Sequence, residues 1–400
     1  MLSLGSCSGF LDTKPDTLLT QDQTFGDPTL VKSVLANFYG RVTIGQRIDD
    51  WDQWTMLDEV IHFDTNSDEN IDRNKWRTYD YTLVHDLNQF LEGIKPSDAV
   101  DEATKTAYIG EVRYIRAWLY FCMGRTLGGV PIINDEIFNY TPGMDITTLQ
   151  IPRSTEADLY DYVISECQEA SKMLTKDTNK NSARANYWVA KMLEARAALT
   201  AASLATYNTA EAHPQLRTNG GEVGIPFSKA QEYYKIALAA AKDVIENGPY
   251  KLMLASEQTH KAYADNFYKA VCQKDGNTEV IWCRDYVSPG QTHQFTKGNL
   301  PKSIEQDTGS DRLSVLLVEA FEPLDATEEQ KGTSIPFEIG TLENPKFFTE
   351  PTELFMERDP RLMGSIIVPG ATFDSKVIEL QAGQLRKENG SWSEVTGARN

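Results

Sequence analysis

The sequence predicts a mostly α protein with a helical scaffold over residues 1–275 and a loop-rich region containing short strands over residues 276–400. Three observations support this class. Apolar residues recur at helical spacing in several segments between residues 29 and 247. Two of those segments carry alanine at contact spacing. After residue 276, periodicity weakens while proline and glycine continue to recur, which is typical of loops, turns and brief strands.

Size and charge exclude several classes of protein. A chain of 400 residues with 40% hydrophobic and 24% charged residues is neither disordered nor transmembrane in composition, and it has no apolar run of membrane-spanning length. Its length favours one large or two fused domains. The formal net charge is −19, which disfavours binding to nucleic acid or to anionic lipid.

The expected helices follow one another with recognisable starts and stops. Pro28 can open the first helix, and Gly128-Gly129 followed by Pro131 ends the longest one. The expected helices begin at residue 29, cover residues 79–94 and 103–127, begin again at residue 154, and cover residues 185–207 and 227–247.

The last two expected helices are rich in small residues. The alanines at contact spacing are Ala190, Ala197, Ala201, Ala230, Ala237 and Ala241, with Tyr234 between the last three. Small residues on one face let helices approach closely, as in tetratricopeptide-type arrays. Because no full 34-residue consensus is present, the pattern predicts a degenerate array, and an ordinary all-α core is the alternative.

The region after Gly248 has a different sequence pattern from the helical region before it. Residues 279–282 form a short strand-like run, and residues 308–323 contain one short amphipathic helix. Loop-rich chain draped on a helical scaffold is where binding residues tend to lie.

Two aromatic clusters lie in polar, aperiodic segments. Their candidate ligand-binding residues are Trp51, Trp54, Asn70, Trp76 and Tyr79 in the first cluster, and Trp282, Tyr286 and His293, near Phe295, in the second. Flat rings beside carboxylates and amides suit a sugar, because its C–H face stacks on the ring while its hydroxyls form hydrogen bonds. Core packing is the alternative interpretation of both clusters.

Searches for catalytic and metal-binding motifs are mostly negative. The sequence contains no G-x-S-x-G elbow flanked by a strand and a helix, no phosphate-binding loop and no H-E-x-x-H, and its five histidines are isolated. No cofactor is therefore expected. Residues 64–72 resemble the start of a calcium loop, but Glu69 and Lys75 replace its glycine and its bidentate ligand, which favours a solvated polar loop. A pair of catalytic carboxylates of the glycosidase type is not excluded, because such a pair is recognised by its separation in space and not by a sequence motif.

The five cysteines form no C-x-x-C pair, which leaves zinc and thioredoxin-like sites without support. Cys122 and Cys167 fall inside helical patterns and are expected to be small buried residues. Cys7 follows Leu4-Gly5-Ser6, the pattern of a bacterial lipoprotein processing site, although the basic and apolar body of a signal peptide does not precede it.

Several segments together resemble the SusD/RagB family of outer-membrane nutrient-binding lipoproteins. The most specific are residues 110–121, which read GEVRYIRAWLYF, and residues 125–131, which read RTLGGVP. The others follow in the family's order at residues 10–15, 151–163, 246–252, 277–282 and 358–362. The similarity therefore spans about residues 7–369, while the family's C-terminal segment is not found.

The resemblance implies fold, partners and location. It implies tetratricopeptide-like helix pairs with a loop-rich ligand face, lipidation at Cys7, and anchoring at the cell surface in the outer membrane. It implies capture of oligosaccharides for a SusC-like TonB-dependent transporter, without catalysis, and it implies that Arg113 and Arg116 order loops rather than touch sugar. The alternatives are a helical-repeat scaffold for protein partners and a glycoside hydrolase.

Overall fold

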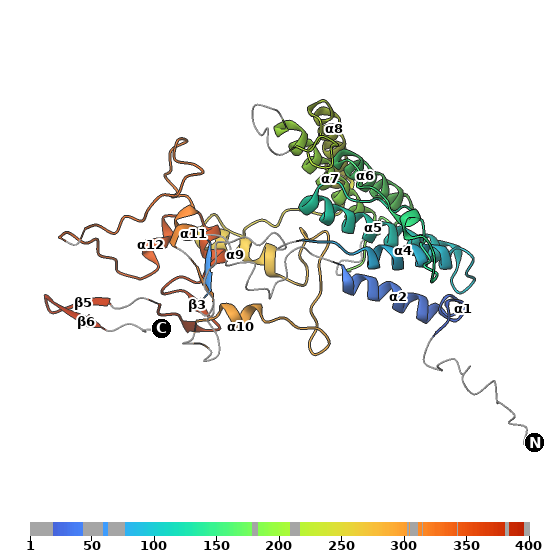
Figure 1. The fold of residues 1–400 in the computed structure, drawn as a ribbon. Helices are drawn as coiled ribbons and strands as arrows, with labels where there is room; N and C mark the ends of the chain where they lie inside the picture. Colours follow the sequence, from blue (N-terminus) through green and yellow to red (C-terminus); the bar gives the residue numbers. More distant parts are fainter. Residues whose placement is uncertain are drawn as a thin grey trace, which may run out of the picture. The chain divides into compact units, whose positions relative to one another are not determined.

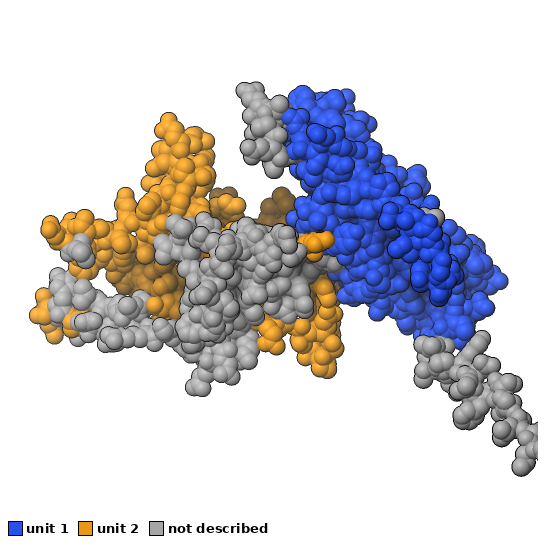
Figure 2. All heavy atoms as spheres, in the orientation of Figure 1, with its two compact units in different colours: residues 1–43, 78–248 blue, residues 44–77, 249–400 orange. Residues whose placement is uncertain are grey.

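A computed structural model describes residues 19–42, 59–62, 77–177, 183–208, 217–301, 304, 311–313, 315–341, 343–380 and 384–395. The chain forms two compact units (Figure 2): unit 1 comprises residues 1–43 and 78–248, and unit 2 comprises residues 44–77 and 249–400. Among the described residues, no helix combines the length and hydropathy needed to cross a membrane.

Unit 1 is a stack of helices (Figure 1). Its elements are α1 (Gln21–Phe25), α2 (Pro28–Arg41), α4 (Tyr81–Ile94), α5 (Glu102–Leu127), η1 (Ile146–Leu149), α6 (Glu156–Met173), α7 (Tyr187–Tyr207), η2 (Phe227–Lys229) and α8 (Ala230–Asn247). From α4 to α8, each long helix packs on the next one along the chain. The predicted mostly α, tetratricopeptide-like scaffold is confirmed.

Side-chain caps set the helix starts. Asp27, just before Pro28, accepts hydrogen bonds from the backbone amides of Thr29 and Leu30 at 2.7 and 3.2 Å. Asp101 caps α5 in the same way through the Thr104 amide at 2.8 Å. Such caps satisfy amides that have no partner inside the helix. The predicted starts therefore lie within two or three residues of the observed ones.

Alanine makes the contact between α7 and α8, with one shift from the prediction. Ala190, Ala197 and Ala201 are fully buried on α7, as expected. On α8 the buried face comprises Ala230, Tyr233, Ala237, Ala240 and Val244, whereas Tyr234 is 38% exposed. The predicted stripe through Tyr234 and Ala241 is thus wrong by one residue. Tyr233 turns inward because its hydroxyl donates to Asp161 Oδ1 on α6 at 2.7 Å.

The turn between α5 and α6 is held by close backbone packing. Gly128 ends α5 with a φ of +73°, a conformation that favours glycine. A Cβ on Gly129 would lie 2.0 Å from the carbonyl oxygen of Ser154. Arg153 donates to the carbonyls of Gly129 and Leu127, both at 2.7 Å. The predicted glycine stop is confirmed, and its second glycine is required by packing.

Unit 2 consists of short elements joined by loops. They are β1 (Val60–His62), α9 (His260–Cys272), α10 (Phe295–Asn299), β2 (Asp311–Leu313), α11 (Val315–Ala320), α12 (Glu353–Met356), α13 (Arg361–Ser365), β3 (Thr372–Phe373), β4 (Lys376–Val377), β5 (Gln384–Glu388) and β6 (Ser391–Val395). The antiparallel pairs are β1 with β2, β3 with β4, and β5 with β6. The β5–β6 hairpin turns at Asn389-Gly390, where both φ angles are positive, as its two-residue turn requires.

A small apolar core holds unit 2 together. Its buried members are Phe355, Leu362, Ile366 and Val368. The predicted short strands are present, and α11 lies inside the predicted helical segment 308–323. The expected strand at residues 279–282 is wrong, because these residues form bends and Thr278 bonds Lys251 instead. Helix α9 belongs to unit 2 here, and the division of the sequence at residue 275 stays a prediction.

Candidate functional site

The second predicted aromatic cluster lies on a turn that we name the aromatic turn, residues 282–295. An antiparallel bridge joins Val287 to Gln291, with the Gln291 amide donating to the Val287 carbonyl at 2.9 Å. This bridge brings Tyr286 and His293 together across the base of the turn. Their ring centroids lie 4.8 Å apart with planes at 87°, an edge-to-face contact.

His293 is oriented by the chain that follows it. Its Nδ1 accepts a hydrogen bond from the amide of Phe295 at 3.3 Å. In a neutral imidazole only one nitrogen carries a proton, so this contact places the proton on Nε2. The aromatic turn thus offers a ring-nitrogen donor beside the Tyr286 ring.

Arg284 completes this group and was not among the predicted site residues. Its guanidinium carbon lies 5.9 Å from the centroid of the Tyr286 ring, within the range of a cation–π contact. The only signal in the sequence is its spacing of two residues from Tyr286. Trp282 and Tyr286 are both partly buried, so each ring keeps some surface accessible to a ligand.

The thiol of the aromatic turn is not activated. Burial, with the nearby Asp285 carboxylate, raises the pKa of the Cys283 thiol. At neutral pH the thiol therefore stays protonated and is a poor nucleophile. Burial also raises the pKa of Cys122 to about 11, which fits the predicted small buried residue. Among the described residues, no three His, Cys, Asp or Glu side chains form a group that could hold a metal ion.

Tyr79 is the described member of the first predicted cluster, and it lies in unit 1. It is 54% exposed, and its ring packs edge-on against Tyr81 at 4.9 Å. Tyr81 contacts Tyr120, and Tyr120 contacts Tyr162, at 6.4 and 5.1 Å between centroids. Tyr79 is thus the exposed end of a row of tyrosines that runs into the helical core.

Several predicted residues lie outside the described part of the chain. They are Trp51, Trp54, Asn70, Trp76, the proposed lipidation residue Cys7, and the calcium-like segment 64–75. Their roles stay predictions.

The predicted structural role of Arg113 and Arg116 is confirmed by their contacts. Arg116 is 1% exposed and donates to Glu166 Oε2 at 2.7 Å and to Asn88 Oδ1 at 2.7 Å. It also donates to the Asn134 carbonyl and pairs with Asp135, at 3.0 and 2.9 Å. Arg113 holds the other oxygen of Glu166 at 2.6 Å. These bonds fix the loop after α5 against α4, α5 and α6.

The stack of consecutive helices in unit 1 defines a helical-repeat protein. Comparison with known proteins points to a family. A SusD-like family model, described as starch-binding and associating with the outer membrane, matches residues 9–199. This match, together with SusD-like relatives and solved SusD-like structures, supports the SusD/RagB family that the sequence motifs predict.

Individual relatives are distant. A SusD-like protein of Bacteroides ovatus is 25% identical over 308 residues, which cover 73% of this chain and 49% of that protein. A solved SusD-like protein of Bacteroides fragilis superposes with a TM-score of 0.63 at 20% identity, covering 90% of this chain and 65% of the other. A solved SusD-like carbohydrate-binding protein of the same species gives 0.61 at 17% identity, covering 88% and 62%. The chain thus spans half the length or less of the curated relatives it matches.

Proposed function

We propose that this protein binds oligosaccharides through the aromatic turn and performs no chemistry on them. The observation that carries the proposal is the Tyr286–His293 pair, fixed across the Val287–Gln291 bridge on a SusD-like fold. An aromatic ring, an imidazole N–H and a guanidinium within one turn supply stacking and hydrogen-bond donors to a sugar.

The same groups predict weak affinity. A stacked ring contributes about 0.5–1.5 kcal/mol, and a hydrogen bond about 1 kcal/mol net. A few of each give about −4 to −8 kcal/mol, which corresponds to millimolar to micromolar dissociation constants. Such affinity suits capture beside a transporter, where tethering raises the local concentration.

Calorimetry of the full chain against a panel of oligosaccharides tests the proposal. For a glycan that binds, Tyr286→Ala, His293→Ala and Trp282→Ala should each weaken binding about two- to tenfold, since each removes one stacking or hydrogen-bonding group. Trp51→Ala and Trp76→Ala test the first predicted cluster in the same way.

Phe347→Ala is the matched control, because Phe347 is a 54% exposed aromatic residue of unit 2 outside the turn. It should leave affinity unchanged. Equal affinity for the wild type and all five variants would refute the site, and absence of binding to every glycan would refute the function.

The outer-membrane association in the description of the matching family model supports a proposal on anchoring and partnership. We propose that Cys7 carries the lipid and that the protein sits at the cell surface in the outer membrane beside a SusC-like TonB-dependent transporter. Stable anchoring requires more than one acyl chain. Cys7→Ser should abolish incorporation of a labelled fatty acid, while Cys272→Ser, at an exposed cysteine of α9, should not.

A scaffold for protein partners is the second candidate, and one observation favours it. Tyr234, Leu238 and Ile245 lie along the outer face of α8 and are 38%, 62% and 76% exposed. If the protein binds only other proteins, the double variant Leu238→Asp with Ile245→Asp should abolish co-purification with the transporter, and no glycan should bind. For a glycoside hydrolase, product would form from the same glycan panel.

A further inference from the structure

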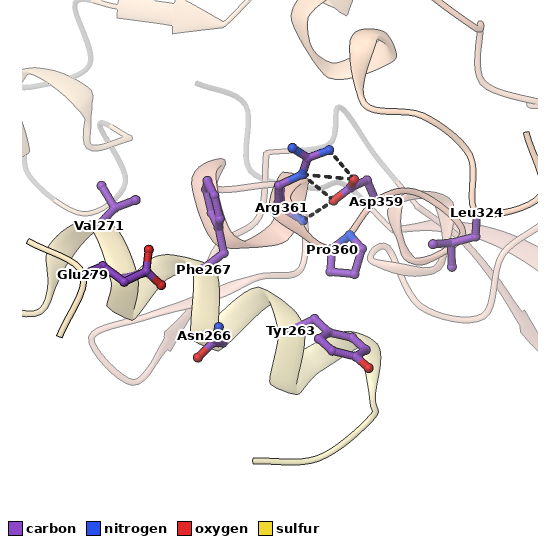
Figure 3. Close-up of a pocket in the computed structure, with 10 residues that line it drawn as sticks. Tyr263, Asn266, Phe267, Val271, Glu279, Leu324, Asp359, Pro360 and Arg361 are labelled. Atoms are coloured by element: carbon purple, nitrogen blue, oxygen red, sulfur yellow. Dashed lines mark hydrogen bonds and ion pairs between the residues drawn. The ribbon is translucent and has the colours of Figure 1, made fainter. Parts of the chain in front are cut away.

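We propose a second carbohydrate site in unit 2, the α9 groove, which takes a neutral sugar residue of the same glycan; this rests on the proposed function. One wall is α9, with Tyr263, Phe267 and Val271, and the other is the segment Asp359–Arg361 with Leu324 (Figure 3). The groove is open to solvent and has a volume of about 520 Å³, within the range of small-molecule sites.

The two walls are held at a fixed distance. Helix α13 packs against α9, and a Cβ on Gly364 of α13 would lie 2.6 Å from the Ala264 carbonyl oxygen and 3.3 Å from Phe267. Glycine therefore permits this approach, and no other residue fits without a shift. A groove whose walls are set by backbone packing needs little rearrangement when it binds a ligand.

The segment opposite α9 is held in place by hydrogen bonds of the buried residue that precedes it. Arg358 is 4% exposed and donates to the carbonyls of Glu319, Phe321 and Ile335. His260, the first residue of α9, donates through Nε2 to the Arg358 carbonyl at 2.8 Å. These bonds fix the backbone that immediately precedes Asp359.

Arg361 places a planar guanidinium at the edge of the groove, and Asp359 fixes its orientation. The Nε and Nη2 atoms of Arg361 donate hydrogen bonds to Asp359 Oδ2 at 3.0 and 2.6 Å. This hydrogen bonding lowers the pKa of Asp359 and raises the pKa of Arg361, so both stay charged. No hydrogen bond among the described residues uses Nη1 of Arg361, which leaves this donor group for a hydroxyl.

Two acceptors are fixed on the α9 side by one backbone residue. Asn266 donates to the Met253 carbonyl at 2.9 Å, and Glu279 accepts from the Met253 amide at 2.8 Å. Within the described part of the chain, Asn266 Oδ1 and Glu279 Oε2 have no hydrogen-bond partner. Both side chains line the groove (Figure 3) and can accept from sugar hydroxyls.

Ring and charge together identify the ligand class. Tyr263 is 46% exposed and lies one helical turn from Phe267, so both rings are on the same face of α9 and offer a stacking surface. Two carboxylates and one guanidinium give the lining a net charge of −1, which repels uronic acids and sulfated sugars. Aromatic faces, two free acceptors and one free donor fit a neutral, hydroxyl-rich ring.

Glycan binding in a background that lacks the aromatic turn tests the α9 groove. We expect the double variant Tyr286→Ala with His293→Ala to retain residual binding of the neutral oligosaccharide selected by calorimetry. Adding Tyr263→Ala should weaken this residual binding about two- to tenfold, because a stacking ring is lost. Tyr268→Ala is the matched control, since Tyr268 is a 55% exposed tyrosine of the same helix that does not line the groove.

The outcomes separate the two proposals. If the wild type binds glycan but the double variant retains no binding, the α9 groove is refuted while the aromatic turn stands. If Tyr263→Ala and Tyr268→Ala have equal effects, the groove is likewise refuted. If the wild type binds no glycan, both proposals fail.

Two further measurements do not depend on the loss of a ring. Glu279→Gln keeps an acceptor for the Met253 amide but removes the net charge, so the groove should admit a uronic-acid oligosaccharide severalfold better. A diazirine-bearing neutral oligosaccharide should crosslink to peptides covering residues 260–272 as well as 282–295. Crosslinks confined to residues 282–295 would contradict the second site.

Discussion

The two units each bury an arginine, but the groups that contact its guanidinium differ. In unit 1, Arg116 bonds Glu166 and Asp135. Burial lowers the pKa of its guanidinium, but Tyr162 and these two carboxylates together outweigh burial and raise the pKa above its usual value. In unit 2, Arg358 bonds three carbonyls and lies 4.0 Å from the Phe337 ring centroid, and burial lowers its pKa.

The difference shows how each unit is specified. In unit 1, charge pairing joins helices that already bury a continuous apolar core. In unit 2 the buried core is small, and one arginine donates hydrogen bonds to the backbone carbonyls of Glu319 in α11 and of the loop residues Phe321 and Ile335. A guanidinium suits this role because its donors form a planar fork.

The largest effect is expected when the charge balance of unit 1 is broken. Glu166→Ala removes the carboxylate that Arg113 and Arg116 share and leaves them only the half-exposed Asp135. Removing one partner of a buried ion pair typically costs about 3–5 kcal/mol of unfolding free energy. Urea denaturation followed by circular dichroism at 222 nm measures this loss. Glu169→Ala, at an exposed ion pair of the same helix, should change stability by less than about 0.5 kcal/mol. Similar values for both variants would show that the buried network is not structural.

A somewhat smaller effect is expected in unit 2. Arg358→Met leaves the carbonyls of Phe321 and Ile335 without this donor, and a buried unsatisfied group costs about 1–3 kcal/mol. We expect faster hydrogen exchange, measured by mass spectrometry, in peptides from residues 315–341 and 353–365. Peptides from α5 should exchange as in the wild type, and equal acceleration in both units would contradict this division.

Glycine substitution compares packing in the two units. Gly364→Ala places a Cβ 2.6 Å from the Ala264 carbonyl oxygen, and such overpacking typically costs about 1–3 kcal/mol. Gly40, inside α2, has no atom within 4 Å of its Cβ position. Gly40→Ala should therefore stabilise unit 1 by about 0.5–1 kcal/mol. Thermal melting of both variants measures these two changes in stability. A change in the same direction for both variants would contradict the prediction.

The smallest effect concerns pH. The hydrogen bond from Arg361 lowers the folded-state pKa of Asp359, so this carboxylate stabilises unit 2 above its unfolded pKa near 3.9. That contribution is lost as pH falls through the folded pKa. Because the Arg361 side chain is 61% exposed, we expect a difference from Asp359→Asn of less than about 1 kcal/mol at pH 7. The difference should vanish below about pH 3 in denaturation curves, and a difference that grew on acidification would contradict the pairing.

The sequence predicts unit 1 well because its signals are local. Gly128-Gly129 marks the end of α5, and the alanines mark the face of α7 that packs on α8. The exchange of Tyr234 for Tyr233 was not predictable, because a helix stripe permits either residue and the choice depends on a hydrogen bond to Asp161 on another helix.

The sites are less predictable because they depend on contacts distant in sequence. Tyr286 and His293 pair because the Val287–Gln291 bridge closes a five-residue turn between them. Both residues were predicted as site residues because they are aromatic side chains in a polar, aperiodic segment. The α9 groove joins residues nearly a hundred positions apart, such as Tyr263 and Arg361, and neither lies in an aromatic cluster. Its two acceptors, on Asn266 and Glu279, are placed by the backbone of Met253, which no side-chain pattern in the sequence marks.

The Val287–Gln291 bridge also bears on protein engineering. It fixes the base of the aromatic turn by a main-chain hydrogen bond, which any residue at position 287 and any residue except proline at position 291 can supply. Side chains at the tip, residues 288–290, are then open to randomisation while the flanking rings keep their spacing. Libraries at these three positions would offer a compact route to changing the sugar specificity of the proposed site.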